Sequence, residues 1–353
     1  MDASVSYNMS INPSVSQEPV SRGPHWALLV SETLFHVIIN RLLSVFGIGS
    51  NIINITVFCK QGFKETITVG LVGLAISDFG TVVGGLVLAE CFNPLMPYEE
   101  WRVKNREVQY LAGSFPRVCF ARITGLITVY ITLERCLCVA IPLHVKRMLK
   151  PKRTFVIVLF IYALVISTIM PVYVGYHLTW KFSPQDNATV FGLVMSQNAP
   201  QLEYITYIAT VVLQMSSFIL LILLTSALVI MLKKKSEWRK QTSSLSENKT
   251  TTSRRDRSAI RLVVMVACIL IGFLTPGTVL FLTTIFEPHF NIGGDYEVHF
   301  YVAWTVVSFC EVANSSLNIF VYYNMNTKYR ETFLSIFCLH KKKLESVTTS
   351  NKI

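Results

Sequence analysis

Charged side chains stand at isolated points within long apolar segments of this chain. Glu134 and Arg135 are adjacent near the end of one such segment, and Pro142 follows within two helical turns. Asp78 lies inside another apolar segment. Charges in apolar surroundings are costly and usually serve a function. We therefore expect these positions to act through ion pairing at or within a membrane.

A second group of charges could recognise an anion. Arg117 and Arg122 lie in the first half of the segment that carries Arg135, and Glu311 lies one turn before Asn314 in a later segment. A guanidinium binds a carboxylate through two parallel hydrogen bonds, so both arginines suit an acidic group on a ligand. Two interpretations stay open: direct contact with a ligand, or internal pairing with Glu311 or Glu90.

The elements that hold these residues are apolar runs long enough to cross a membrane. The chain has 353 residues, of which 52% are hydrophobic and 15% are charged, against about 25% charged in soluble proteins. A helix of about 20 apolar residues spans a bilayer. The sequence predicts an all-α bundle of seven transmembrane helices, followed by a short amphipathic cytoplasmic helix. The seven runs cover roughly 32–59, 67–92, 108–141, 154–176, 204–232, 258–286 and 298–323.

The placement of the basic residues predicts the orientation of the bundle. Of the 32 Lys and Arg residues, 23 fall in 60–66, 142–153, 233–261 and the tail after 324. Cytoplasmic loops carry such an excess, so the N-terminus should be extracellular and the C-terminus cytoplasmic. Because the basic residues alternate with membrane spans, we expect a lipid bilayer as partner and no nucleic acid. No cleavable signal peptide is expected.

This topology divides the chain into four parts and places three modification sites. We expect an extracellular segment (1–30), a transmembrane domain (31–325), an amphipathic membrane-surface helix (326–338) and a cytoplasmic tail (339–353). Asn8 and Asn187 begin Asn-x-Ser/Thr sequons on the outer side, which predicts glycosylation. Cys338, close to a lysine cluster, suits either palmitoylation or an ordinary reduced thiol.

Several motifs in the seven segments match one receptor class in order and spacing. In chain order they are Asn51, Leu74–Asp78, Glu134–Cys136, Phe273–Pro276, Asn314–Tyr322 and Lys328–Phe333. Together they resemble the rhodopsin-like (class A) G-protein-coupled receptors over about residues 30–340. The run Pro116–Gly125, with the Glu134–Cys136 motif, is similar to molluscan chemosensory receptors, which in turn resemble invertebrate neuropeptide receptors.

The resemblance implies a cytoplasmic activation switch. Arg135 would pair locally in the inactive state and enter the G-protein pocket in the active state, and the proline of the sixth segment would bend its helix. Asp256 would either tether Arg135 or point into water; both readings stay open. The implied switch residues are Glu134, Arg135, Asp256, Pro276, Asn318 and Tyr322.

The resemblance also implies an ion site in the middle of the membrane. In the family the matching positions surround a sodium ion, and oxygen ligands suit a small hard cation. A polar packing network without an ion is the other interpretation. The candidate ligands are Asp78, Thr124, Asn314, Ser315 and Asn318. We expect no other cofactor.

The chain departs from the family at several positions. Tyr110 stands where a cysteine is usual, and the second outer loop, 177–203, has no cysteine, so the usual disulfide is absent. Leu274 replaces a common tryptophan, and Ile319 replaces the proline of the seventh-segment motif. Arg117 stands where amine receptors have an aspartate, which argues against an amine ligand.

The sequence therefore predicts a plasma-membrane receptor that couples an extracellular ligand, a peptide or a chemosensory small molecule, to a heterotrimeric G protein. A transporter or channel with seven spans is the alternative. It would require an internal repeat or broken paired helices, and the sequence has neither. We expect no enzyme, because no nucleophile with a base and no metal-ligand cluster stands at the membrane faces.

Overall fold

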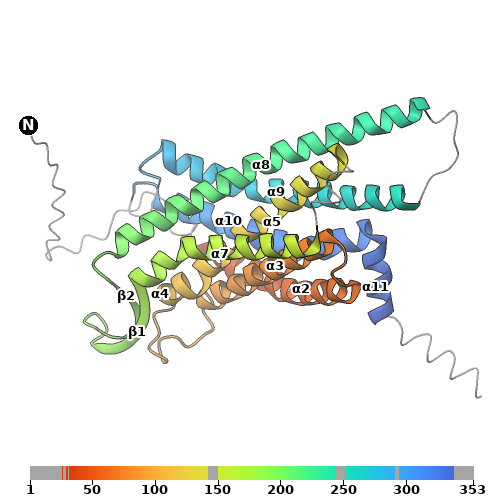
Figure 1. The fold of residues 1–353 in the computed structure, drawn as a ribbon. Helices are drawn as coiled ribbons and strands as arrows, with labels where there is room; N and C mark the ends of the chain where they lie inside the picture. Colours follow the sequence, from red (N-terminus) through yellow and green to blue (C-terminus); the bar gives the residue numbers. More distant parts are fainter. Residues whose placement is uncertain are drawn as a thin grey trace, which may run out of the picture.

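A computed structural model describes residues 26, 29–30, 32–141, 150–242, 251–290 and 294–337; of 235–242 and 251–259 it describes the backbone alone. Long helices run side by side to form one bundle (Figure 1). The first span joins a π-helical segment to an α-helix, and the third is approached through two short helices. The elements up to the third span are η1 (Glu32–Asn40), α2 (Arg41–Gln61), α3 (Thr66–Cys91), α4 (Asn105–Gln109), η2 (Tyr110–Ser114) and α5 (Phe115–Ala140).

The remaining spans follow in the predicted order. They are α7 (Pro151–Gly175), α8 (Ala199–Thr242), α9 (Thr251–Phe286) and α10 (Glu297–Met325), followed by the short α11 (Thr327–Phe337). Both α8 and α9 extend past their predicted apolar runs, since α8 ends at Thr242 and α9 begins at Thr251. The prediction of an all-α, seven-transmembrane bundle is confirmed.

The seventh span differs from the others in composition. Among the described residues, six helices are long and apolar enough to cross a membrane, and α10 is not one of them. Its 29 residues would reach about 43 Å, more than a bilayer needs. Its buried residues, however, include Ser308, Glu311, Asn314, Ser315 and Asn318. The polarity of α10 therefore comes from the face that builds the interior of the bundle.

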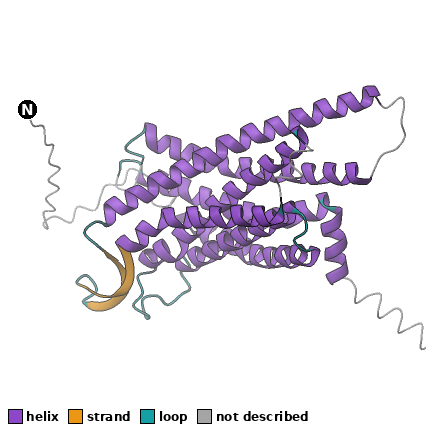
Figure 2. Cartoon of the chain, viewed as in Figure 1, coloured by secondary structure: helices purple, strands orange, loops and turns teal. Residues whose placement is uncertain are grey.

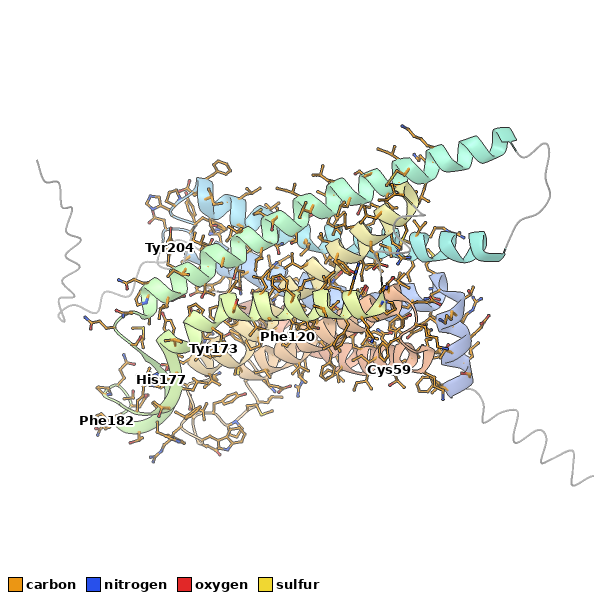
Figure 3. The ribbon with its side chains drawn as sticks, viewed as in Figure 1. Cys59, Phe120, Tyr173, His177, Phe182 and Tyr204 are labelled. Carbon is orange, nitrogen blue, oxygen red and sulfur yellow. The ribbon has the colours of Figure 1, made fainter. Side chains whose placement is uncertain are left out.

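A two-stranded sheet at one end of the bundle was not predicted. Strand β1 (Tyr176–Ser183) pairs antiparallel with β2 (Ala188–Met195), with Trp180 opposite Phe191. Figure 2 shows this hairpin beyond the ends of the helices. In Figure 3, His177 and Phe182 mark it at the end opposite Cys59. Asn187, the predicted glycosylation site, lies in its exposed turn at a φ of 46°, which asparagine tolerates.

Glycines bring α3 close to the helix that carries the charged residues. A Cβ added at Gly84 would lie 2.8 Å from the backbone nitrogen of Arg117, and one at Gly113 would lie 3.0 Å from that of Leu88. The contact at Gly84 is shorter than real Cβ atoms show, and the one at Gly113 is tight, so a larger residue at Gly84 would force the two helices apart. Small residues are a common way to pack helices closely in lipid. Gly84 thus fixes the depth at which Arg117 enters the bundle.

Candidate functional site

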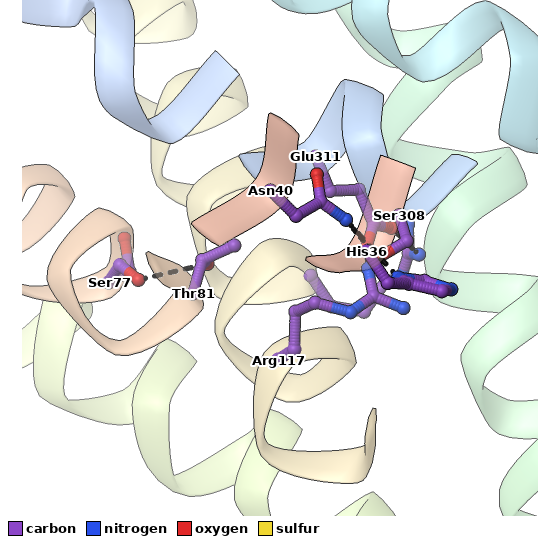
Figure 4. Close-up of polar contacts among 8 residues, drawn as sticks. His36, Asn40, Ser77, Thr81, Arg117, Ser308 and Glu311 are labelled. Atoms are coloured by element: carbon purple, nitrogen blue, oxygen red, sulfur yellow. Dashed lines mark hydrogen bonds and ion pairs between the residues drawn. The ribbon is translucent and has the colours of Figure 1, made fainter. Parts of the chain in front are cut away.

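Two arginines of α5 share one glutamate of α10 inside the bundle. Arg122 Nη2 donates to Glu311 Oε1 at 2.7 Å, and Arg117 Nη1 pairs with Glu311 Oε2. Arg117 is 0% exposed, Arg122 3% and Glu311 6%. Figure 4 shows Arg117 and Glu311 facing each other across the helices. We call these three residues the arginine triad; their pairing is internal.

Glu90, the other acid considered as a partner, does not reach the triad. Its Oε1 lies 2.8 Å from Nε of Arg41 on the first span. Arg117 also approaches the ring of Trp304, with 6.0 Å from Cζ to the ring centroid. An aromatic face attracts a cation at this distance. Glu311 is therefore the carboxylate that pairs with both arginines among the described residues.

Two polar side chains of η1, the first part of the first span, lie beside the arginine triad. His36 Nε2 lies 3.3 Å from Thr305 Oγ1, and Asn40 Nδ2 lies 3.3 Å from His36 Nδ1 and donates to Ser308 Oγ at 3.4 Å. Figure 4 shows His36, Asn40 and Ser308 beside the arginine triad. The sequence analysis did not assign a role to His36 or Asn40. The available signal was their position, since both are polar residues inside an apolar run.

The residues of the predicted ion site form a hydrogen-bonded polar network around Asp78. Thr124 Oγ1 donates to Asp78 Oδ1 at 2.9 Å, and Asn318 Nδ2 donates to Asp78 Oδ2 at 2.7 Å. Ser77 Oγ lies 2.8 Å from Thr124 Oγ1. Three of the five predicted ligands are thus in direct contact around a carboxylate that is 0% exposed. These contacts make a polar packing network in their own right.

The residues present also fit a small cation. A cavity of about 10 Å³, enough for roughly one water molecule, lies between α5, α9 and α10. Thr124, Asn314 and Ser315 line it together with Glu311. The cavity lining therefore offers the carboxylate of Glu311, the hydroxyls of Thr124 and Ser315 and the amide oxygen of Asn314. Oxygen ligands of this kind are those that hard cations prefer. All five predicted residues lie at this network or at the cavity beside it.

The adjacent charges near the end of α5 pair with each other. Arg135 Nη2 pairs with Glu134 Oε1, and the same nitrogen lies 3.3 Å from Thr66 Oγ1 at the start of α3. Thr66 also donates to Glu134 Oε1. Glu134 is 1% exposed and Arg135 is partly buried, although the chain positions lie near a helix end. We call Thr66, Glu134 and Arg135 the inner lock.

The other predicted switch residues have mixed outcomes. Asp256 lies in α9, but its side chain is outside the described part of the structure, so no contact with Arg135 is stated. Pro276 lies inside α9, and α10 runs unbroken through Ile319. Tyr322 is 0% exposed, and its hydroxyl has no hydrogen-bond partner among the described residues.

Tyr322 packs in an aromatic cluster that joins three helices. Its ring centroid lies 5.1 Å from that of Phe58 and 5.7 Å from that of Tyr329. The hydroxyl of Tyr329, on α11, donates to Asn54 Oδ1 at 2.6 Å, and Asn54 Nδ2 donates to Asn51 Oδ1 at 3.3 Å. These bonds anchor α11 to the first span. The role of Tyr329 was not predicted.

At the end of the bundle that carries the β1–β2 hairpin, polar contacts hold the region of Tyr110, where the receptors that the sequence resembles have a cysteine. Tyr110 and Tyr176 both donate to the carboxylate of Glu203, the second at 2.5 Å. Burial and the bond to Glu203 raise the pKa of Tyr176, which keeps its hydroxyl protonated as a donor. Glu107 Oε2 accepts from Lys181 Nζ and from the backbone of β2, both at 2.7 Å. We call Tyr110, Tyr176 and Glu203 the outer clasp.

Two predicted modification sites lie outside the described residues, namely Asn8 and Cys338. The cysteines that the structure describes form no disulfide with one another. In the described part of the chain, no group of His, Cys, Asp and Glu side chains is arranged to hold a metal ion. The arginine triad, the Asp78 network and the inner lock each hold a buried charged side chain among the described residues.

Comparison with known proteins identifies the family. No curated protein matches the chain. A family model does match it, over residues 38–340, which include the helices from α2 to α11 and both charged ends of α5. Since this match covers far more than half of the 353 residues, the chain belongs to the serpentine type 7TM GPCR chemoreceptor family Srw, a family of G-protein-coupled chemoreceptors.

Proposed function

We propose that this chemoreceptor passes the binding of an extracellular peptide or small molecule to a heterotrimeric G protein at the cytoplasmic end of α5. The single observation that supports this most is the inner lock. Arg135 is held by Glu134 and Thr66 on the side of the bundle where the basic loops lie. A guanidinium held by one adjacent carboxylate and one hydroxyl can exchange these partners for a G protein.

The inner lock joins two helices through one arginine. Thr66 begins α3, and Glu134 and Arg135 lie near the end of α5. Arg135 Nε and Glu134 Oε2 have no partner among the described residues, so the pair is not saturated. A receptor state in which Arg135 turns toward a G protein would be selected by the agonist through its higher affinity for that state. The motifs would then work as they do in rhodopsin-like receptors.

The ligand end of the proposal is the arginine triad. Arg117 and Arg122 lie in the outer half of α5 under the proposed orientation, with the N-terminus outside and the C-terminus in the cytoplasm. We propose that an acidic group of the ligand binds to these arginines, beside Glu311. In this orientation, glycans would be attached at Asn8 and Asn187 outside the cell, and a lipid anchor at Cys338 in the cytoplasm. The Asp78 network would hold a sodium ion.

Basal nucleotide exchange on a reconstituted G protein tests the signalling part without a known ligand. Arg135→Ala should abolish basal exchange, and Glu134→Gln should raise it, because the lock loses its carboxylate charge. Lys152→Ala is the control, since Lys152 is an exposed cation on the same side of the membrane. If Arg135→Ala leaves both basal and ligand-driven exchange intact, the proposed mechanism is wrong.

A further inference from the structure

We infer that the arginine triad selects a ligand group with a single negative charge, and that Glu311 sets this number. The inference rests on the proposed function, which places the acidic group of the ligand at Arg117 and Arg122. It goes further, because it states the charge of that group and assigns Glu311 a role in specificity.

The charge count gives the first step. Arginine stays protonated in proteins, so Arg117 and Arg122 carry two positive charges, whereas Glu311 carries one negative charge. Each oxygen of Glu311 is already used by one of the arginines. No other carboxylate pairs with either arginine in the part of the chain that the structure describes. The triad thus has one uncompensated positive charge.

Unused hydrogen-bond donors give the second step. Arg117 Nε and Nη2 and Arg122 Nε and Nη1 are buried and have no acceptor among the described residues. Both side chains are more than nine-tenths buried. A buried donor without a partner costs about 1–3 kcal/mol, and more for a charged group. An anion that accepts from these nitrogens satisfies the donors and the charge together, without displacing Glu311.

The apolar surroundings limit the anion to one charge. A monoanion brings the site to neutrality, whereas a dianion leaves a negative charge in a low-dielectric interior. Burying an unpaired charge is strongly unfavourable. Replacing Glu311 with glutamine would raise the count to two positive charges and move the preference to a dianion. Replacing Arg122 with glutamine would leave Arg117 and Glu311 balanced, with no anion required.

Entry to this site requires the outer end of the bundle to open, because the unused nitrogens are buried. Tyr110 lies two helical turns before Arg117 on the same helical path, and it belongs to the outer clasp. The clasp consists of hydrogen bonds, so it can release and re-form without bond cleavage. An acid that reaches the triad therefore passes a region held by polar contacts in place of a disulfide.

The test uses the full-length receptor in lipid nanodiscs with three four-carbon probes: butyrate, succinate and the neutral butyramide. Thermal unfolding is measured near neutral pH at constant ionic strength, with probes in the millimolar range where small fragments bind. For the wild type we expect butyrate to stabilise more than succinate, and butyramide to have no effect. Glu311→Gln should reverse the order of the two acids.

Variants of Arg122 separate charge from fold. Arg122→Gln should weaken butyrate binding by at least about tenfold, because a buried charge partner is lost. Arg122→Lys should keep the preference for butyrate. Arg106→Gln is the control, since Arg106 pairs with Glu32 at 2.9 Å but is 66% exposed. If Glu311→Gln does not fold, the comparison of the two Arg122 variants decides.

Three results would overturn the inference: equal stabilisation by butyramide and butyrate, a wild-type preference for succinate, or no stabilisation by any probe. Replacing sulfate with chloride at constant ionic strength shows whether the monoanion is inorganic: competition between chloride and butyrate indicates that source, and no chloride effect indicates an organic acid. Nucleotide exchange is measured separately. A charge preference without exchange supports the site and contradicts the signalling function, whereas exchange without a charge preference does the reverse.

Discussion

Tyr329→Phe removes one hydroxyl from the end of the bundle where α11 lies and leaves the aromatic ring in place. The hydroxyl donates to Asn54 Oδ1 at 2.6 Å, and both residues are 0% exposed. The ring should keep its contacts with Phe58 and Tyr322. The change therefore isolates one buried hydrogen bond that joins α11 to the first span.

The expected loss of stability follows from this geometry. A net intramolecular hydrogen bond contributes about 0.5–1.5 kcal/mol, and side-chain bonds between transmembrane helices average about 0.6 kcal/mol with a maximum near 1.7. The Tyr329–Asn54 bond is short and fully buried, so we expect about 1 kcal/mol. That corresponds to roughly a fivefold change in the unfolding equilibrium.

A double-mutant cycle measures this term. Unfolding of the purified receptor in bicelles is compared for Tyr329→Phe, Asn54→Ala and the double variant. If the bond is present, Tyr329→Phe destabilises the wild type by about 1 kcal/mol and has almost no effect in the Asn54→Ala background. Tyr204→Phe, at a 66% exposed tyrosine, is the control for loss of a hydroxyl. Equal effects of Tyr329→Phe in both backgrounds would refute the reasoning.

Two further predictions concern the outer clasp and the Asp78 network. Tyr110→Phe, which removes one donor to Glu203, should lower the unfolding free energy by about 0.5–1.5 kcal/mol, measured as for Tyr329; no loss would mean that the clasp does not replace the missing disulfide. Exchange of choline for sodium at constant chloride should raise the melting temperature of the wild type but not of Asp78→Asn, because the variant lacks the carboxylate; a sodium effect that persists in Asp78→Asn would leave the polar network as the better interpretation.

Helical spacing predicts most of the polar residues that share the interior face of a helix. Glu311 lies one turn before Asn314 and two turns before Asn318, so the three share the face that points into the bundle. Thr124 occupies the matching depth on α5, where it meets Asp78. The family resemblance then supplies which helices come together. Helical spacing together with the family resemblance was therefore enough to expect these contacts.

Contacts between distant residues could not be predicted in the same way. Tyr110 and Glu203 are separated by 93 positions, and their contact depends on how the hairpin of β1 and β2 folds over α4 and η2. The hairpin itself was missed although apolar residues alternate strictly with polar ones along β1, at Tyr176, Leu178, Trp180 and Phe182, a pattern typical of a strand. Tyr329 and Asn54 are 275 positions apart in the chain. The hydroxyl of Tyr329 is the one polar atom of a side chain that otherwise packs as an aromatic ring.

Because α10 contributes to both, the anion site proposed at the arginine triad and the sodium site proposed at Asp78 should act together. Glu311 contacts the arginines of α5, and Asn318 contacts Asp78 of α3, about 10 Å further along the same helix. A helix transmits an axial shift over two turns with little loss, since its backbone hydrogen bonds hold it rigid. An anion whose binding beside Glu311 shifted α10 along its axis would therefore also move Asn318 relative to Asp78. By linkage, a cation at Asp78 must change the affinity of the triad for the anion by the same factor as the anion changes the affinity for the cation.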